Sequence, residues 1–88
     1  MSNKLSGVQL RAARALLRWS ALDLALASKV GVATIRRVEV FDGQISATAA
    51  NDAALRRALE EAGVEFIGEN GGGPGVRLRK PLKEKSAE

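Results

Sequence analysis

The chain has 88 residues, which is enough for one compact domain and too few for two hydrophobic cores. It contains no Cys and no His, so the usual zinc ligands, disulfides and the commonest general base are missing, and we expect neither an enzyme nor a cofactor or metal site. Fourteen Lys and Arg against ten Asp and Glu give a net charge of +4, which favours a polyanionic partner.

The first predicted helix begins after Ser6. Ser6 and Gln9 have the spacing of a capping box, in which each side chain satisfies a backbone group at the start of a helix. Apolar residues recur at helical spacing from Leu10 to Leu17, so the helix should extend to about Arg18. The basic residues on its other faces, which we expect to be solvated, are Arg11, Arg14 and Arg18.

Two short helices should follow, separated by a brief turn. Ser20 and Asp23 repeat the capping spacing, which predicts a second helix over residues 21–28. Residues 29–31 interrupt the pattern, and helical spacing resumes over residues 32–40. We expect Arg36 and Arg37 to be exposed on this third helix, and Glu39 to pair with Arg36 or with an arginine elsewhere.

A fourth helix is predicted after a turn at residues 41–44. Either Ser46 or Thr48 can cap it, and Gly63 should end it. Its apolar residues at helical spacing are Leu55, Ala58, Leu59 and Ala62. The first 63 residues should therefore form one helical domain.

The remaining residues change in character. Residues 64–67 and 76–79 are rich in β-formers and are separated by a glycine-rich stretch, which indicates a hairpin. We assign residues 64–79 to this β element. Residues 80–88 are charged and have no apolar repeat, which is typical of a flexible tail.

The second and third predicted helices meet the packing requirements of a helix-turn-helix. That motif needs a small residue where its helices meet, an apolar residue in the turn and an apolar inner face on the second helix. The residues that supply these features are Leu24, Ala25, Val30, Ile35 and Val38.

Over residues 8–62 the chain resembles the Cro/CI-type helix-turn-helix regulators, also called the XRE family. The resemblance is clearest in Leu24-Ala25, Val30 and residues 34–39, and residues 56–67 resemble the ending of many short bacterial members. It implies a lambda-repressor-like, mainly α domain of four to five helices with a short C-terminal β-hairpin or strand.

Two residues depart from the family pattern, and both lie in the turn. Lys29 stands where such regulators usually have Gly, and Gly31 stands where they often have Ser as the cap of the recognition helix. A lysine with positive φ carries a strain of about 1 kcal/mol, and Gly is an acceptable cap. We therefore expect the motif to tolerate both residues.

The resemblance implies a sequence-specific transcriptional regulator that binds double-stranded DNA, a repressor or an activator, with residues 32–40 as its recognition helix. The residues placed to reach base edges in the major groove are Val32, Ala33, Arg36 and Arg37. The residues suited to phosphate contacts are Ser20, Ala21, Lys29 and Thr34. Among these, Arg36 and Arg37 are the main candidates for reading bases.

We also expect a homodimer that binds an inverted repeat. The hairpin would present an apolar face that a second copy covers, made of Val64, Phe66, Val76 and Leu78. The alternative is a protein-interaction module of the same fold, antitoxin-like or a co-regulator, with weak or no DNA binding and a regulatory protein as partner.

The expected location is the cytoplasm, at the nucleoid when DNA is bound. No apolar run reaches the roughly 20 residues that a membrane-spanning helix needs, and the N-terminal residues do not resemble a secretory signal. We therefore expect no membrane contact.

Overall fold

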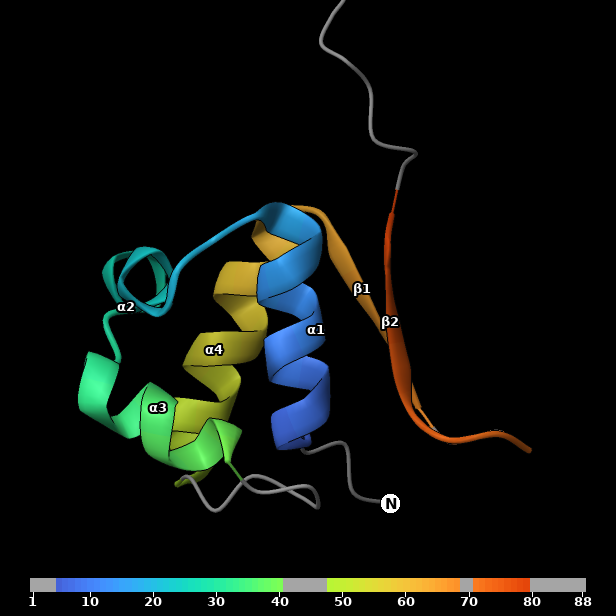
Figure 1. Ribbon diagram of the computed structural model, residues 1–88, viewed down its shortest axis with the longest axis horizontal. Coiled ribbons are helices and arrows are strands. Elements are labelled where there is room, and N and C mark those ends of the chain that lie inside the picture. The colour runs from blue at the N-terminus through green and yellow to red at the C-terminus, as the bar shows by residue number, and fades with distance from the viewer. Residues whose placement is uncertain (1–4, 41–47, 69–70, 80–88) are drawn as a thin grey trace, which may run out of the picture.

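The computed structural model describes residues 5–40, 48–68 and 71–79. These residues form α1 (Gly7–Leu17), α2 (Ala21–Ser28), α3 (Val32–Glu39), α4 (Ala49–Glu61), β1 (Val64–Ile67) and β2 (Gly75–Leu78). Figure 1 shows α1 and α4 in the centre of the view, with α2 and α3 on one side and the two strands along the other side of α1. α1 packs against α3 and both strands, and α4 packs against α2 and β1. The predicted mainly α architecture with a short β-hairpin is confirmed at this level.

The helix boundaries follow from the caps that the sequence predicts. The Ser6 hydroxyl accepts a hydrogen bond from the Gln9 N–H at 3.0 Å, and the Gln9 side chain accepts one from the Ser6 N–H at 3.1 Å. Thr48 caps α4 through a 3.1 Å bond from the Asn51 N–H, whereas the alternative cap, Ser46, lies outside the described residues. Gly63 follows α4 with φ of +113°, a conformation open to glycine and strained for other residues.

One hydrophobic core joins the helices and the hairpin. The helical side chains that lose all contact with solvent are Leu10, Ala13, Leu24, Ile35, Val38, Leu55 and Leu59. Leu5, which precedes α1, and Val64 of β1 are equally buried. Among the described residues no aromatic side chain is fully inside this core, which lets the helices pack closely.

The hairpin packs against its own helices. β1 and β2 are antiparallel, with Val64 opposite Leu78 and Phe66 opposite Val76. Phe66 and Val76 are partly buried against the helical core, and Arg56 of α4 lies over the Phe66 ring at 5.1 Å from its centroid. The Gln9 amide donates to the carbonyls of Ile67 at 3.3 Å and Gly75 at 3.0 Å, which ties the start of α1 to both strands.

This packing corrects the expected role of the apolar hairpin face. We predicted that Val64, Phe66, Val76 and Leu78 would be left for a second copy to cover, but Val64 is fully buried in the core of its own chain. Alternate strand residues point to the same side of a sheet, so Phe66 shares this face with Val64. The two strands pack against α1 and α4, and Phe66 and Val76 pack against the core. The Val64 side chain is therefore covered by its own chain, and the dimer itself stays a prediction.

Two of the earlier assignments concern residues outside the described part. These are the turn at residues 41–44 and the tail at residues 80–88. Within the described ranges, no helix has the length and apolar character needed to cross a membrane.

Candidate nucleic-acid interface

The candidate interface is built on α2, the turn after it, and α3. Leu24 of α2 and Ile35 of α3 are fully buried, and Val30 in the turn is 5% exposed. Val38 is buried and Ala25 packs against the core, so all five residues predicted to hold the two helices together point inward. These contacts fix α3 relative to α2.

The turn between α2 and α3 contains the two residues that depart from the family pattern, Lys29 and Gly31. Lys29 adopts φ of 67° and ψ of 20°, the left-handed region, and its N–H donates to the Ala25 carbonyl at 2.8 Å. The Val30 N–H donates to the Ser28 hydroxyl at 3.1 Å. Gly31 then takes the N-cap position of α3 with extended backbone and gives that helix no side-chain cap.

An ion pair between Arg14 and Glu39 fixes the C-terminal end of α3. Arg14 of α1 donates to both carboxylate oxygens of Glu39, at 2.7 Å from Nε and 2.9 Å from Nη2. A third bond at 2.9 Å joins Arg14 Nη1 to the Trp19 carbonyl. The hydrogen bond to Glu39 raises the pKa of the Arg14 guanidinium, while its partial burial acts in the opposite direction.

Arg14 is therefore a structural residue rather than the solvated one we predicted. The sequence predicted that Glu39 pairs with Arg36 or with an arginine elsewhere, but it did not indicate Arg14. In the structure its partner is 25 positions away in sequence, so helical spacing could not select it. Trp19 packs against the core, as expected.

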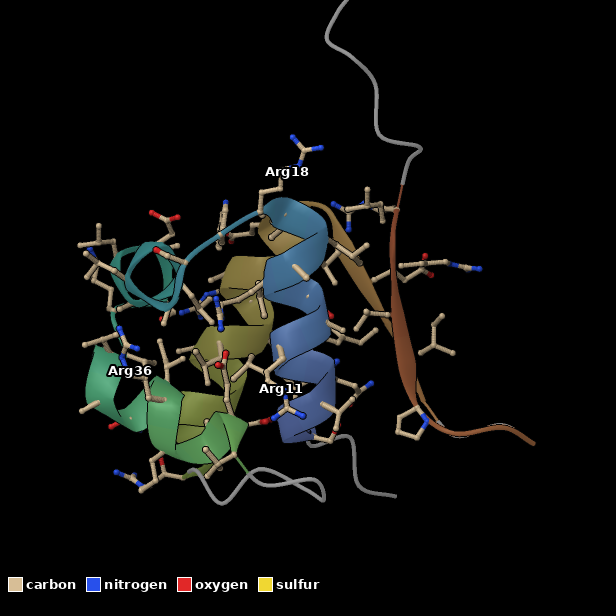
Figure 2. The ribbon with its side chains drawn as sticks, in the orientation of Figure 1. Arg11, Arg18 and Arg36 are labelled. Atoms are coloured by element: carbon tan, nitrogen blue, oxygen red, sulfur yellow. The ribbon has the colours of Figure 1, made fainter. Side chains whose placement is uncertain are left out.

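The residues predicted to reach bases divide into two groups. Ala33, Arg36 and Arg37 are exposed on α3. Figure 2 shows Arg36 at the outer side of the molecule, where the chain passes from α2 into α3. Val32 is partly buried and packs against the core, so only part of its surface is open to a ligand.

The residues predicted to bind phosphate also differ in what they offer. Lys29 is exposed and Thr34 is partly buried. Ser20 is exposed, but its hydroxyl accepts from the Asp23 N–H at 3.0 Å and its N–H donates to the Asp23 carboxylate at 2.9 Å. Ala21 has a buried side chain, so it can contact a phosphate only through its backbone N–H.

The cations of the described residues fall into two groups as well. On the hairpin and α4, Arg77 pairs with Glu65 at 2.9 Å, and Arg79 donates to the Glu60 carbonyl at 3.0 Å. Arg56 pairs with Glu60 at 3.5 Å. The exposed cations that make no ion pair or side-chain hydrogen bond with other described residues include Arg18, Lys29, Arg36 and Arg37.

These four cations border or belong to α2 and α3, where the exposed acidic residue is Asp23, so positive charge exceeds negative charge among the exposed described residues of this segment. It also carries an apolar feature that we did not predict, because Leu22 and Leu26 of α2 are 55% and 69% exposed. Among the described residues no group of His, Cys, Asp and Glu could hold a metal ion.

Comparison of the sequence with models of known protein families and with curated proteins finds no match.

Proposed function

We propose that the chain is a sequence-specific DNA-binding transcriptional regulator of the helix-turn-helix type, with α3 as the helix that enters the major groove. The observation that carries the proposal is that Arg36 and Arg37 are exposed on α3 and make no ion pair or side-chain hydrogen bond with other described residues. The opposite face of that helix is fixed in the core by Ile35 and Val38. An arginine reads guanine by donating two hydrogen bonds to O6 and N7.

The charge distribution supports the same orientation. Phosphate contacts provide a large share of the affinity of a DNA-binding protein, and they need cations that are not already paired within the protein. Lys29 is exposed and lies in the turn directly before α3, while Arg77 is already paired with Glu65 on the hairpin. The proposal includes membership of the Cro/CI-type regulators, on the resemblance in residues 8–62. It also includes a lambda-repressor-like packing of the helices.

The test is selection of bound sites from random double-stranded DNA, followed by titration of the selected duplex. Replacing Arg36 or Arg37 by Ala should weaken binding by about 5- to 150-fold, the equivalent of one lost bidentate base contact. The loss should be specific to particular base pairs. Arg77→Ala is the matched control, because it removes the same charge from the hairpin, on the opposite side of α1 from α3 (Figure 1).

Two outcomes would contradict the proposal. One is selection that yields no preferred sequence and no binding of any duplex at 50 mM salt. The other is a selected duplex to which R36A, R37A and R77A bind equally well, because α3 would then not read the bases.

The regulator would act as a dimer on an inverted repeat, occupying an operator where it excludes or recruits RNA polymerase. With Val64 buried, the contact would have to use the outer edges of the two strands and the exposed parts of Phe66, Val76 and Leu78. Each strand has one neighbour in the described part of the chain, so its other edge is open to a further strand. Sedimentation equilibrium that finds only monomer at micromolar concentration, with and without DNA, would exclude the dimer.

The second candidate function is a protein-interaction module of the same fold. The exposure of Leu22 and Leu26, four positions apart on α2, favours it, because such apolar pairs on a helix surface are typical of protein contacts. Leu26→Lys distinguishes the two functions. It should leave selection of a DNA sequence intact if the chain acts through DNA alone, and it should abolish capture of a partner protein if α2 is a protein-binding surface.

A further inference from the structure

Two basic residues occupy backbone positions that favour glycine. Arg18 has φ of 59° and Lys29 has φ of 67°, and they are the non-glycine residues with positive φ in the described ranges. Each is the C-cap of a helix, Arg18 of α1 and Lys29 of α2. A residue with a Cβ is less stable here than glycine, so the presence of a long cationic side chain at both sites needs an explanation.

Neither side chain is explained by contacts within the molecule. Both are exposed, and neither makes a side-chain hydrogen bond or an ion pair with the described residues. A cation near a helix C-terminus gains some energy from the helix dipole, but glycine would gain more from relief of backbone strain if that were the only consideration.

The backbone around Arg18 is held in fixed relation to α3. The Trp19 N–H donates to the Arg14 carbonyl at 2.9 Å, and the Trp19 carbonyl accepts from Arg14 Nη1 at 2.9 Å. Arg14 in turn holds Glu39 at the end of α3. The position of Arg18 relative to α3 is therefore set by a continuous chain of hydrogen bonds. Figure 2 shows its side chain pointing away from the helices where the chain leaves α1 for α2.

The two cations bracket α2. That helix has eight residues, and at a rise of 1.5 Å per residue it is about 12 Å long. In helix-turn-helix complexes the first helix of the motif crosses the backbone while the second lies in the groove.

We propose that Arg18 and Lys29 are a pair of phosphate anchors, one at each end of α2, that bind the DNA backbone which α2 crosses while α3 lies in the groove. This inference rests on the proposed DNA binding and adds Arg18 to it. Phosphate anchors supply affinity on every sequence and leave base preference unchanged.

The test compares Arg18→Gly, Lys29→Gly and Arg18→Lys with the wild type. Binding is titrated between 50 and 300 mM salt on the duplex selected from random DNA and on an unrelated duplex of equal length, and thermal unfolding is followed in parallel. Each glycine variant should reduce the slope of log K against log salt by about 0.9, and should weaken binding to both duplexes about eightfold at 0.1 M salt.

Three further readouts separate anchoring from a structural role. The ratio of affinities for the two duplexes should stay constant in the glycine variants, and their unfolding midpoints should rise or stay level, because glycine relieves strain. Arg18→Lys should retain the wild-type salt slope.

Unchanged slopes of log K against log salt in R18G and K29G would overturn the proposal that these residues bind phosphate. If R36A still weakened binding, the proposed function would stand. Lower unfolding midpoints with unchanged slopes would likewise overturn them, since the side chains would then serve only as helix caps. A wild-type chain that binds neither duplex would refute the proposed function itself.

Discussion

Removing the carboxylate of Glu39 should destabilise the whole domain, because it leaves the Arg14 guanidinium without its main partner. The Glu39 side chain is 8% exposed and that of Arg14 is 22% exposed, so water reaches the pair only from one side. In Glu39→Ala, Arg14 keeps its bond to the Trp19 carbonyl and loses both bonds to the carboxylate.

The expected cost follows from this geometry. Breaking a buried ion pair by removing one partner costs about 3–5 kcal/mol, and the partial exposure of Arg14 puts this case near 3 kcal/mol. For a domain of this size that lowers the unfolding midpoint by about 12–24 °C. Glu39→Gln retains an acceptor but loses the charge, so we expect about half of that effect.

The assay is urea denaturation and thermal unfolding monitored by circular dichroism, with Arg14→Ala and the double variant completing a cycle. The double variant should cost less than the sum of the single variants by about 2 kcal/mol. Glu65→Ala is the matched control, because it removes a carboxylate from the exposed pair with Arg77 and should lower the midpoint far less than E39A does. The reasoning is refuted if E39A and E65A unfold alike, or if the effects of R14A and E39A simply add.

Three other predictions concern the hairpin and its attachment. Gln9→Glu keeps the capping oxygen but replaces the amide that donates to two hairpin carbonyls, so it should cost about 2–4 kcal/mol by urea titration, and a value as small as that of a surface mutation would contradict the role of this amide. Gly63→Ala meets no atom within 4 Å, yet φ of +113° should make it about 1–2 kcal/mol less stable, and a variant as stable as the wild type would show that the turn relaxes freely. The hydrogen bond from Arg77 lowers the pKa of Glu65 below its ordinary value of 4.5. The pair therefore stabilises the hairpin above that value and loses its effect as the pH falls through the lowered pKa. An NMR titration of the Glu65 carboxyl should show its midpoint rising toward 4.5 in Arg77→Ala, and equal midpoints in the two proteins would contradict the pairing.

Much of the local structure could be predicted because its determinants are close together in the chain. Ser20 and Asp23 are three residues apart, and their spacing alone fixes the start of α2. A positive φ at Lys29 was indicated only by its place in the turn, where similar regulators usually have Gly. Gly63 could be assigned the end of α4 because glycine is common directly after a helix. The second strand runs one residue earlier than predicted, since Gly75 extends the ladder at its first position.

The contacts that could not be predicted join residues that are far apart in sequence. Nothing in the spacing of Gln9 indicates that its amide reaches carbonyls 58 and 66 positions away. The burial of Val64 depends on the direction in which the chain turns after Gly63, which brings β1 back along α4. An alternating strand pattern indicates which residues share a face, but it does not indicate whether that face meets its own helices or a partner.

The candidate site was predictable to the same extent. Exposure of Ala33, Arg36 and Arg37 follows from the helical period, because Ile35 and Val38 define the opposite face. The partial burial of Val32 depends on how closely the start of α3 approaches the core, which periodicity does not specify.

The unequal ends of α3 have a consequence for its motion. Its last residue is clamped by Arg14, whereas its first turn begins at Gly31 with no side-chain cap. Amide hydrogens in the first turn should therefore exchange with solvent faster than those near Val38. If α3 is the DNA-reading helix we propose, its first turn can adjust to the surface it contacts, and ordering that turn on binding costs conformational entropy. In Gly31→Ser the hydroxyl can accept a hydrogen bond from a backbone N–H of the first turn, which would make that turn more rigid. The helix would then adapt to fewer binding surfaces.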